Sequence, residues 1–106
     1  MNISITTRGY KAPERLKSYL ADKLKRLDRF ADQIMNIDAI FSYEKLNQVV
    51  EFKVQLRKKH FIVKERTDDI FKSIDLGIDN VERQITKIKE KTREHDKRKI
   101  TEMVEQ

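Results

Sequence analysis

The 106-residue chain has no cysteine and no tryptophan, and it contains only one proline and two glycines. Without cysteine it can form neither a disulfide framework nor a thiolate metal site or thiol nucleophile. Two glycines are too few for a phosphate-cradling GxxxxGK or GxGxxG loop, so we do not expect nucleotide hydrolysis. No run of 18 apolar residues occurs, and the N-terminus does not resemble a signal peptide. We therefore expect a soluble, cytoplasmic protein without a membrane partner.

Groups for catalysis are equally sparse. The two histidines, His60 and His95, fall at an expected hairpin tip and near the end of an expected helix, so they form no pair, HExxH motif or triad. Asp68 and Asp69 could form an acid-base or metal pair, but adjacent carboxylates at a helix start are usually capping residues. We expect no catalytic residues, no metal, no cofactor and no small-molecule substrate.

Positive charge is what the chain has in excess. It carries 24 Lys and Arg against 18 Asp and Glu, for a formal net charge of +6. This balance favours a polyanionic partner. The stretch 82–99 alone holds eight basic and four acidic residues. At this length the chain is expected to form one domain with a single core.

Hydrophobic periodicity predicts the elements along the chain. Ile3 and Ile5 alternate with polar residues, which indicates a short strand. Pro13 is expected at the first position of a helix that runs to about Phe30. Alternating apolar residues then predict strands over 37–43, 50–56 and 61–66. A polar turn at 44–48 and a tight turn at 58–60 separate these three strands.

The segment 68–99 predicts one long amphipathic helix. Its apolar residues are three or four apart and form a stripe that a core can cover: Phe71, Ile74, Ile78, Val81, Ile85 and Ile88. Arg83, Lys87 and Lys91 project from roughly the opposite side. Cations one helical turn apart can meet successive phosphates, although an ordinary solvated face has the same pattern. Gly77 costs such a helix about 1 kcal/mol relative to alanine and indicates close packing there.

The predicted order β-α-β-β-β-α defines the fold class. A strand-helix-strand crossover makes a parallel pair, and hairpins add antiparallel strands. Both apolar helix stripes must cover one face of the resulting four-stranded mixed sheet. We therefore predict a two-layer α+β fold with two helices on one face of the sheet. Residues 1–95 are expected to form the domain and residues 96–106 a charged, flexible C-terminal tail.

Candidate binding groups are plentiful and mostly basic. The first helix carries Lys17, Lys23, Lys25, Arg26 and Arg29, and the last hairpin carries Arg57, Lys58 and Lys59. Tyr10 is the main candidate for an exposed aromatic, whereas Phe41, Tyr43, Phe52, Phe61 and Phe71 fit the core. Outward aromatics on strands, as in single-strand RNA binders, are missing. Recognition by phosphate and shape is therefore expected rather than recognition by base sequence.

Three stretches resemble one protein family. The segment 69–87 is similar to the second helix of bacterial ribosome hibernation-promoting factors, which reads Asp-hydrophobe-Tyr/Phe-x-x-Ile-Asp and then x-x-x-x-hydrophobe-x-Arg-Gln-hydrophobe-x-Lys. The opening Met-x-Ile-x-Ile-Thr and the Lys-Leu-Lys-Arg-Leu of residues 23–27 also match, so the resemblance covers about residues 1–95. The hairpin 57–60 departs from the Asn-Gly type of turn often seen there. The chain resembles the short form most, which is related to the ribosome-associated inhibitor.

This resemblance implies a fold topologically related to double-stranded RNA-binding domains. It also implies a translational silencer of stationary phase and stress response. Such a protein binds the small ribosomal subunit and its ribosomal RNA in the decoding channel and blocks the messenger and transfer RNA sites of idle ribosomes. We expect it to be monomeric off the ribosome. The RNA-binding residues that it implies are Lys23, Lys25, Arg26, Arg29, Arg83, Gln84, Lys87, Lys89 and Lys91.

Two other functions are compatible with the charge pattern. The first is a general double-stranded RNA-binding module, which would bind free duplexes as well as vacant ribosomes. The second is a protein-interaction regulator of a transcription factor, in which the basic face would meet carboxylates and the complex would resist ribonuclease.

Overall fold

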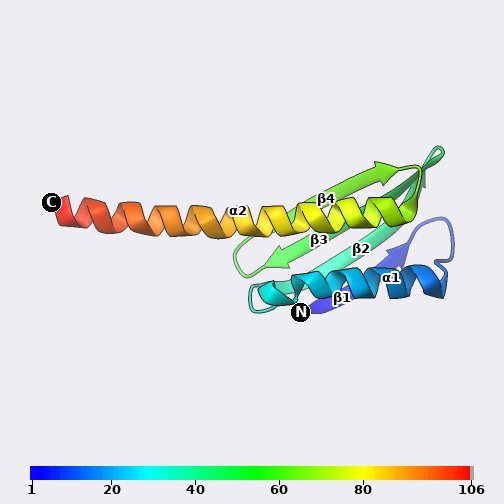
Figure 1. Ribbon diagram of the computed structural model, residues 1–106, viewed down its shortest axis with the longest axis horizontal. Coiled ribbons are helices and arrows are strands. Elements are labelled where there is room, and N and C mark those ends of the chain that lie inside the picture. Colours follow the sequence, from blue (N-terminus) through cyan, green and yellow to red (C-terminus); the bar gives the residue numbers. More distant parts are fainter. Residues whose placement is uncertain (106) are drawn as a thin grey trace.

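A computed structural model describes the backbone of residues 1–105 and the side chains of residues 1–90. The elements follow in the predicted order (Figure 1). They are β1 (Asn2–Thr7), α1 (Glu14–Leu24), the 3-10 helix η1 (Lys25–Phe30), β2 (Ile34–Glu44), β3 (Asn47–Leu56), β4 (His60–Thr67) and α2 (Ile70–Glu105).

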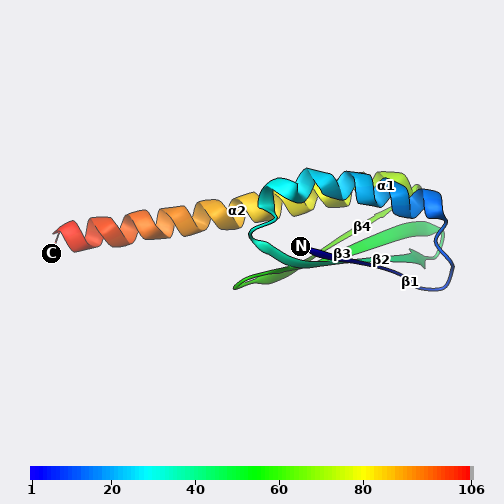
Figure 2. The same ribbon diagram turned by 90° about the horizontal axis from the view of Figure 1, so that it is seen from below.

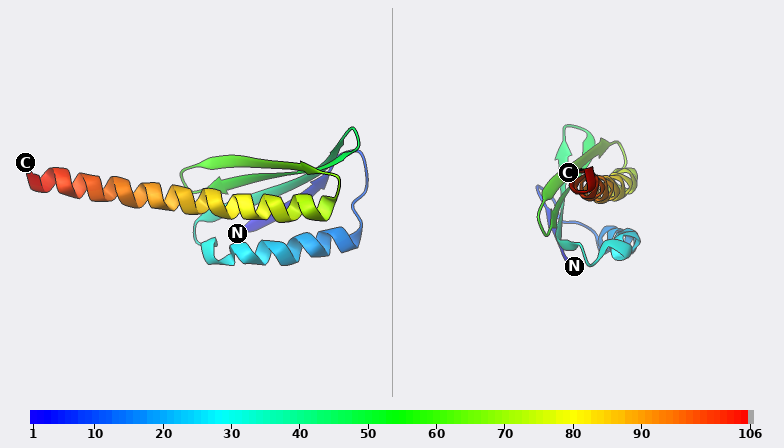
Figure 3. Two further views of the ribbon diagram at one scale, coloured as in Figure 1. Left: turned by 45° about the horizontal axis from the view of Figure 1, so that its top comes forward. Right: turned by 90° about the vertical axis from the view of Figure 1, so that its left-hand side faces the viewer.

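The four strands form one mixed sheet in the order β1-β2-β3-β4. β1 is parallel to β2, and the two following pairs are antiparallel. Both helices lie on the same face of this sheet, as the two turned views show (Figures 2 and 3). The predicted two-layer α+β arrangement is therefore confirmed.

The core lies between the helices and the inner face of the sheet. β2 and β3 send alternate residues into it, and the helices contribute residues at helical spacing. Gly77 of α2 sits directly above Phe52 of β3, because a Cβ at this glycine would lie only 2.4 Å from the ring atom Cε2. The close packing predicted at Gly77 is confirmed.

The first helix differs from its prediction at both ends. Pro13 is the N-cap residue, with an extended ψ of 150°, and is not the first residue of the helix. From Lys25 the helix tightens to 3-10 geometry, in which side chains three apart lie above one another. Leu24, Leu27 and Phe30 are three apart and all buried, so the tighter turn keeps all three in the core.

Tyr43 corrects the prediction about the core. It lies near the end of β2 with 52% of its surface exposed, so its expected place in the core is wrong. Its ring packs instead against Tyr10, with 4.8 Å between the ring centroids. The reason is its position one residue from the end of the strand, at the margin of the layer that the helices cover.

α2 begins at Ile70, two residues later than predicted. Asp69 accepts a hydrogen bond from the Phe71 backbone N–H at 3.0 Å, which confirms its capping role. The helix runs to Glu105, past the predicted end. The side chains of the predicted tail, 96–106, lie outside the described residues, and its flexibility stays a prediction.

The solvent face of the sheet carries a small charged cluster. The carboxylate of Glu44, at the end of β2, accepts hydrogen bonds from two residues of β4. Lys64 donates one at 2.5 Å and Arg66 the other at 2.9 Å. Hydrogen bonds, first from Lys64 and then from Arg66, lower the pKa of the Glu44 carboxyl. The cluster ties the end of the β2–β3 hairpin to β4.

Candidate nucleic-acid interface

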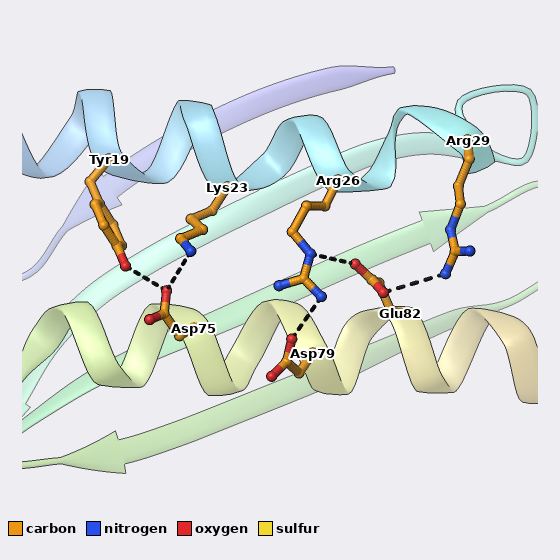
Figure 4. Close-up of polar contacts among 7 residues, drawn as sticks. All are labelled: Tyr19, Lys23, Arg26, Arg29, Asp75, Asp79 and Glu82. Carbon is orange, nitrogen blue, oxygen red and sulfur yellow. Dashed lines mark hydrogen bonds and ion pairs between the residues drawn. The ribbon is translucent and has the colours of Figure 1, made fainter.

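A line of ion pairs joins the two helices where they lie side by side (Figure 4). Arg26 lies at its centre and contacts both Asp79 and Glu82 of α2, each at 2.9 Å. Arg29 reaches the other oxygen of Glu82 at 3.4 Å, and Lys23 lies 3.5 Å from Asp75. We call these three cations and three carboxylates the interhelix ladder.

The ladder follows from spacing on both helices. Lys23, Arg26 and Arg29 are three residues apart, and the tightened turn of η1 aligns residues at this spacing on one side. The carboxylates of α2 lie at positions i, i+4 and i+7, which places them on one flank of that helix. The acidic residues beside the apolar stripe of α2 are visible in the sequence. Their spacing along one helix does not show which cations of the other helix they contact.

Hydrogen bonding reinforces the contact between the helices at Arg26, in the centre of the ladder, and at Asp75. The bond with Asp79 is the main reason that the pKa of Arg26 is raised, and Glu82 adds to it. Tyr19 donates a hydrogen bond to Asp75 at 2.7 Å. This bond, followed by burial, raises the pKa of the Tyr19 hydroxyl. The ladder therefore links α1 and η1 to α2 where the packing of the helices brings these side chains together.

The ladder reduces the positive charge that the basic residues of the predicted first helix can offer to a partner. Three cations against three carboxylates leave it without net charge, so Lys23, Arg26 and Arg29 do not form a separate cationic surface. Lys25, the first residue of η1, pairs instead with Asp22 of α1 at 3.3 Å. The first helix thus offers less uncompensated charge than its sequence suggests.

The basic residues predicted on α2 are placed differently. Arg83, Lys87 and Lys89 are exposed, and none of them forms an ion pair with another described side chain. Gln84 is exposed beside them. The side chain of Lys91 lies outside the described residues. Within residues 1–90, Arg83 and Lys87 therefore carry uncompensated charge on the solvent side of α2. Lys89, four residues after the buried Ile85, lies on the flank of the apolar stripe.

An open hollow of about 1000 Å³ runs along this part of α2. Arg29, Arg83, Gln84 and Lys87 line it, so it brings together predicted residues from both helices. Its lining also holds four carboxylates. Asp79 and Glu82 are paired in the ladder. Glu65, which accepts a hydrogen bond from the neutral amide of Asn80 at 3.3 Å, and Glu90 keep their negative charge. Arg83 and Lys87 are the cations of this lining without an ion pair to another described side chain, and they can bind phosphates of a nucleic-acid backbone.

Within the described residues there is no group of three or more histidines and carboxylates that could hold a metal ion. Among the described residues, no helix is both long and apolar enough to span a membrane.

Comparison with known proteins adds independent information. The model of the family described as "Sigma 54 modulation protein / S30EA ribosomal protein" matches residues 3–93. A protein of Azotobacter vinelandii named ribosome hibernation promoting factor is 30% identical over 91 residues, which cover 86% of this chain and 85% of that protein. Its namesake in Escherichia coli K12 is 24% identical over 95 residues, or 90% of this chain and all of that protein.

Two solved structures are also similar. A ribosomal subunit interface protein from Coxiella burnetii has a TM-score of 0.79 at 31% identity, over 84% of this chain and 98% of that one. The N-terminal domain of Thermus thermophilus Protein Y has a TM-score of 0.73 at 27% identity, over 83% of this chain and 99% of that one.

Proposed function

Because this chain belongs to the family described as "Sigma 54 modulation protein / S30EA ribosomal protein", we propose that it is a ribosome hibernation factor. It acts in the cytoplasm, has no enzymatic activity and associates with idle ribosomes. The family match carries this proposal, together with the names of relatives such as that of Azotobacter vinelandii.

In the mechanism that we propose, the protein occupies the decoding channel of the small subunit and excludes messenger and transfer RNA. Inhibition is then competitive occlusion, which needs tight binding but no chemistry. Contacts to phosphates position a protein without reading bases, and such contacts suit an RNA surface of fixed shape. The protein acts as a monomer before it binds.

We propose different roles for the RNA-binding residues, according to whether they take part in the ladder. Arg83 and Lys87, with Lys89 and Lys91, make the main phosphate contacts, and Gln84 adds a neutral hydrogen-bonding group. The ladder cations Lys23, Arg26 and Arg29 hold the two helices at a fixed spacing and present their remaining N–H groups to the RNA. Lys25 contributes at the edge of the interface. About six phosphate contacts would lower the affinity on the order of a thousandfold between 50 and 200 mM salt.

The decisive experiment reverses charge at one exposed lysine on each face of the molecule. Lys87→Glu changes the proposed interface, and Lys53→Glu makes the same change in net charge on the opposite face of the sheet. We expect Lys87→Glu, and more strongly Arg83→Glu with Lys87→Glu, to abolish co-sedimentation with vacant small subunits. Lys53→Glu should co-sediment like the wild type. Equal losses in both single variants would mean that only overall charge matters and would overturn the assignment of this face.

A protein partner is the second candidate, since the family description also names modulation of sigma 54. In that case the basic face of α2 meets carboxylates of a transcription factor. Treatment of the captured complex with ribonuclease separates the two functions, because a ribosomal complex falls apart and a protein complex survives.

A further inference from the structure

α1 and α2 begin at the same end of the molecule (Figure 1). A small cavity with an aromatic lining lies there. Its volume is about 190 Å³. Tyr10, Tyr43 and Phe71 contribute aromatic rings to its lining, and Lys11 and Arg15 contribute cations. The proposed phosphate contacts on α2 make no use of this cavity.

The aromatic ring of Tyr43 lies outside the hydrophobic core and is partly open to solvent. Its side chain is 52% exposed, and the ring is tilted by 56° against that of Tyr10. Burial, and then the neighbouring Tyr43, raise the pKa of the Tyr10 hydroxyl. The pair therefore forms a wall with one ring anchored in the protein and the other open to solvent.

The two cations at the rim are not compensated. Lys11 and Arg15 are exposed and form no ion pair with the other side chains of residues 1–90. The Arg15 guanidinium lies over the Phe71 ring, 5.6 Å from its centroid. The nearby carboxylate of Glu14 is engaged with Lys17 at 3.7 Å. The rim is thus suited to an anionic group.

We propose that this cavity receives one unpaired base of an RNA strand, stacked on Tyr43, while Lys11 and Arg15 bind the adjoining phosphates. A volume of about 190 Å³ is below the roughly 300–1,000 Å³ of ordinary small-molecule pockets and suits a single flat ring system. Aromatic platforms hold bases of any kind, because every base has a π-face. The inference rests on RNA as the partner and adds a base contact to the phosphate contacts proposed above.

The position of the cavity allows one strand to reach both sites. Phe71 and Arg83 lie on the same helix, twelve residues apart, which corresponds to about 18 Å along the helix axis and about 120° around it. Single-stranded sites of about 4–16 nucleotides are common on small domains. A single strand can therefore place one base in the cavity and its phosphates along α2.

The test measures binding of a labelled single-stranded oligoadenylate to the full chain by fluorescence anisotropy. Tyr43→Ala removes the stacking surface and is expected to weaken binding roughly five- to 150-fold. Tyr43→Phe keeps the ring and should bind like the wild type. Tyr43→Leu keeps an apolar side chain without a π-face and should bind as weakly as the alanine variant. Lys11→Gln should reduce the slope of log affinity against log salt by about 0.7.

The contrary results are equally specific. Undiminished binding by Tyr43→Ala, or full binding by Tyr43→Leu, would overturn base stacking, and the second result would indicate docking of an apolar protein group. An effect of Tyr43→Ala of the same size on a fully paired RNA duplex would also refute an unpaired base. If adenosine monophosphate competes as tightly as the oligonucleotide binds, the cavity is a site for free nucleotides. That result would overturn the proposal that it binds a base of an RNA strand.

This test can fail separately from the proposed function. Loss of oligonucleotide binding in Tyr43→Ala, without ribosome association of the wild type, would refute hibernation and leave the base site standing. Ribosome association that depends on Lys87, with oligonucleotide binding indifferent to Tyr43, would refute the base site alone. At a saturating concentration of the oligonucleotide, chemical shifts of the Tyr43 ring protons, compared with those of the buried Phe52, report the stacking directly.

Discussion

Gly77→Ala tests how closely α2 packs against the Phe52 ring of β3. The added methyl group would lie 2.4 Å from Cε2 and 2.9 Å from Cδ2 of Phe52, whose side chain is fully buried. Real Cβ atoms do not approach other carbons so closely, so the ring or the helix has to move.

The expected magnitude is a difference between two effects. Alanine stabilises a helix interior by about 1 kcal/mol relative to glycine. Overpacking a well-packed core costs about 1–3 kcal/mol, and a clash with a buried ring lies toward the upper end. We therefore expect Gly77→Ala to lower the free energy of unfolding by about 1–2 kcal/mol.

Thermal and urea unfolding measure this change. For a domain of this size, 1 kcal/mol shifts Tm by about 4–8 °C, so the variant should melt about 4–16 °C lower. Phe52→Leu removes the ring atoms and supplies the partner for a double-mutant cycle. In that background Gly77→Ala should be neutral or stabilising by up to about 1 kcal/mol. A Gly77→Ala variant with raised Tm in the wild-type background would refute the reasoning.

Three further predictions concern charged and polar side chains. Glu82→Gln weakens the contacts with Arg26 and Arg29 and should lower the free energy of unfolding by about 0.5–2 kcal/mol. Calorimetry should find a smaller difference between variant and wild type in 1 M salt, because salt screens ion pairs. Glu44 has a lowered pKa in the fold, so its stabilisation is present above its unfolded pKa and is lost as pH falls through the folded value. Urea unfolding should therefore separate Glu44→Gln from the wild type at pH 7 and not in strong acid. Tyr19 has a raised pKa, so its contribution is complete below about pH 10 and is lost above its folded pKa. Tyr19→Phe should flatten the alkaline fall in stability, and an unchanged alkaline limb would contradict the bond to Asp75.

The pattern of apolar residues accounts for most of the correct predictions of the fold. Alternation in β2 and β3 and three-to-four spacing in α2 are properties of single elements, and each element shows its buried face by itself. Strand order followed because a short chain with one crossover and two hairpins has few ways to build a sheet. The same reasoning failed for Tyr43, because alternation along a strand does not show where the covering helices end.

The candidate site was less accessible to such reasoning. The positions of Arg83 and Lys87 opposite the apolar stripe were evident from helical periodicity. The partners of Lys23, Arg26 and Arg29 were not, since ion pairs between residues about 50 positions apart depend on how two helices pack. The pairing of Tyr10 with Tyr43 joins a loop to a strand end and has no signature in the sequence.

By itself, the sequence determined the order of the elements, the apolar faces of the helices and the excess of positive charge. It also determined the close packing at Gly77 and a family motif over residues 69–87. These features are local, or sum over the chain, and need no knowledge of distances. Only the tertiary structure decided which cations are free. It paired Lys23, Arg26 and Arg29 with three carboxylates of α2. Within residues 1–90 it left Arg83 and Lys87 on the solvent side of α2 without an ion pair, and it formed an aromatic cavity beside Lys11 and Arg15. The reason is physical: the effect of a charge depends on what lies within a few ångströms of it, and for these residues only the packing of α1 on α2 sets that distance.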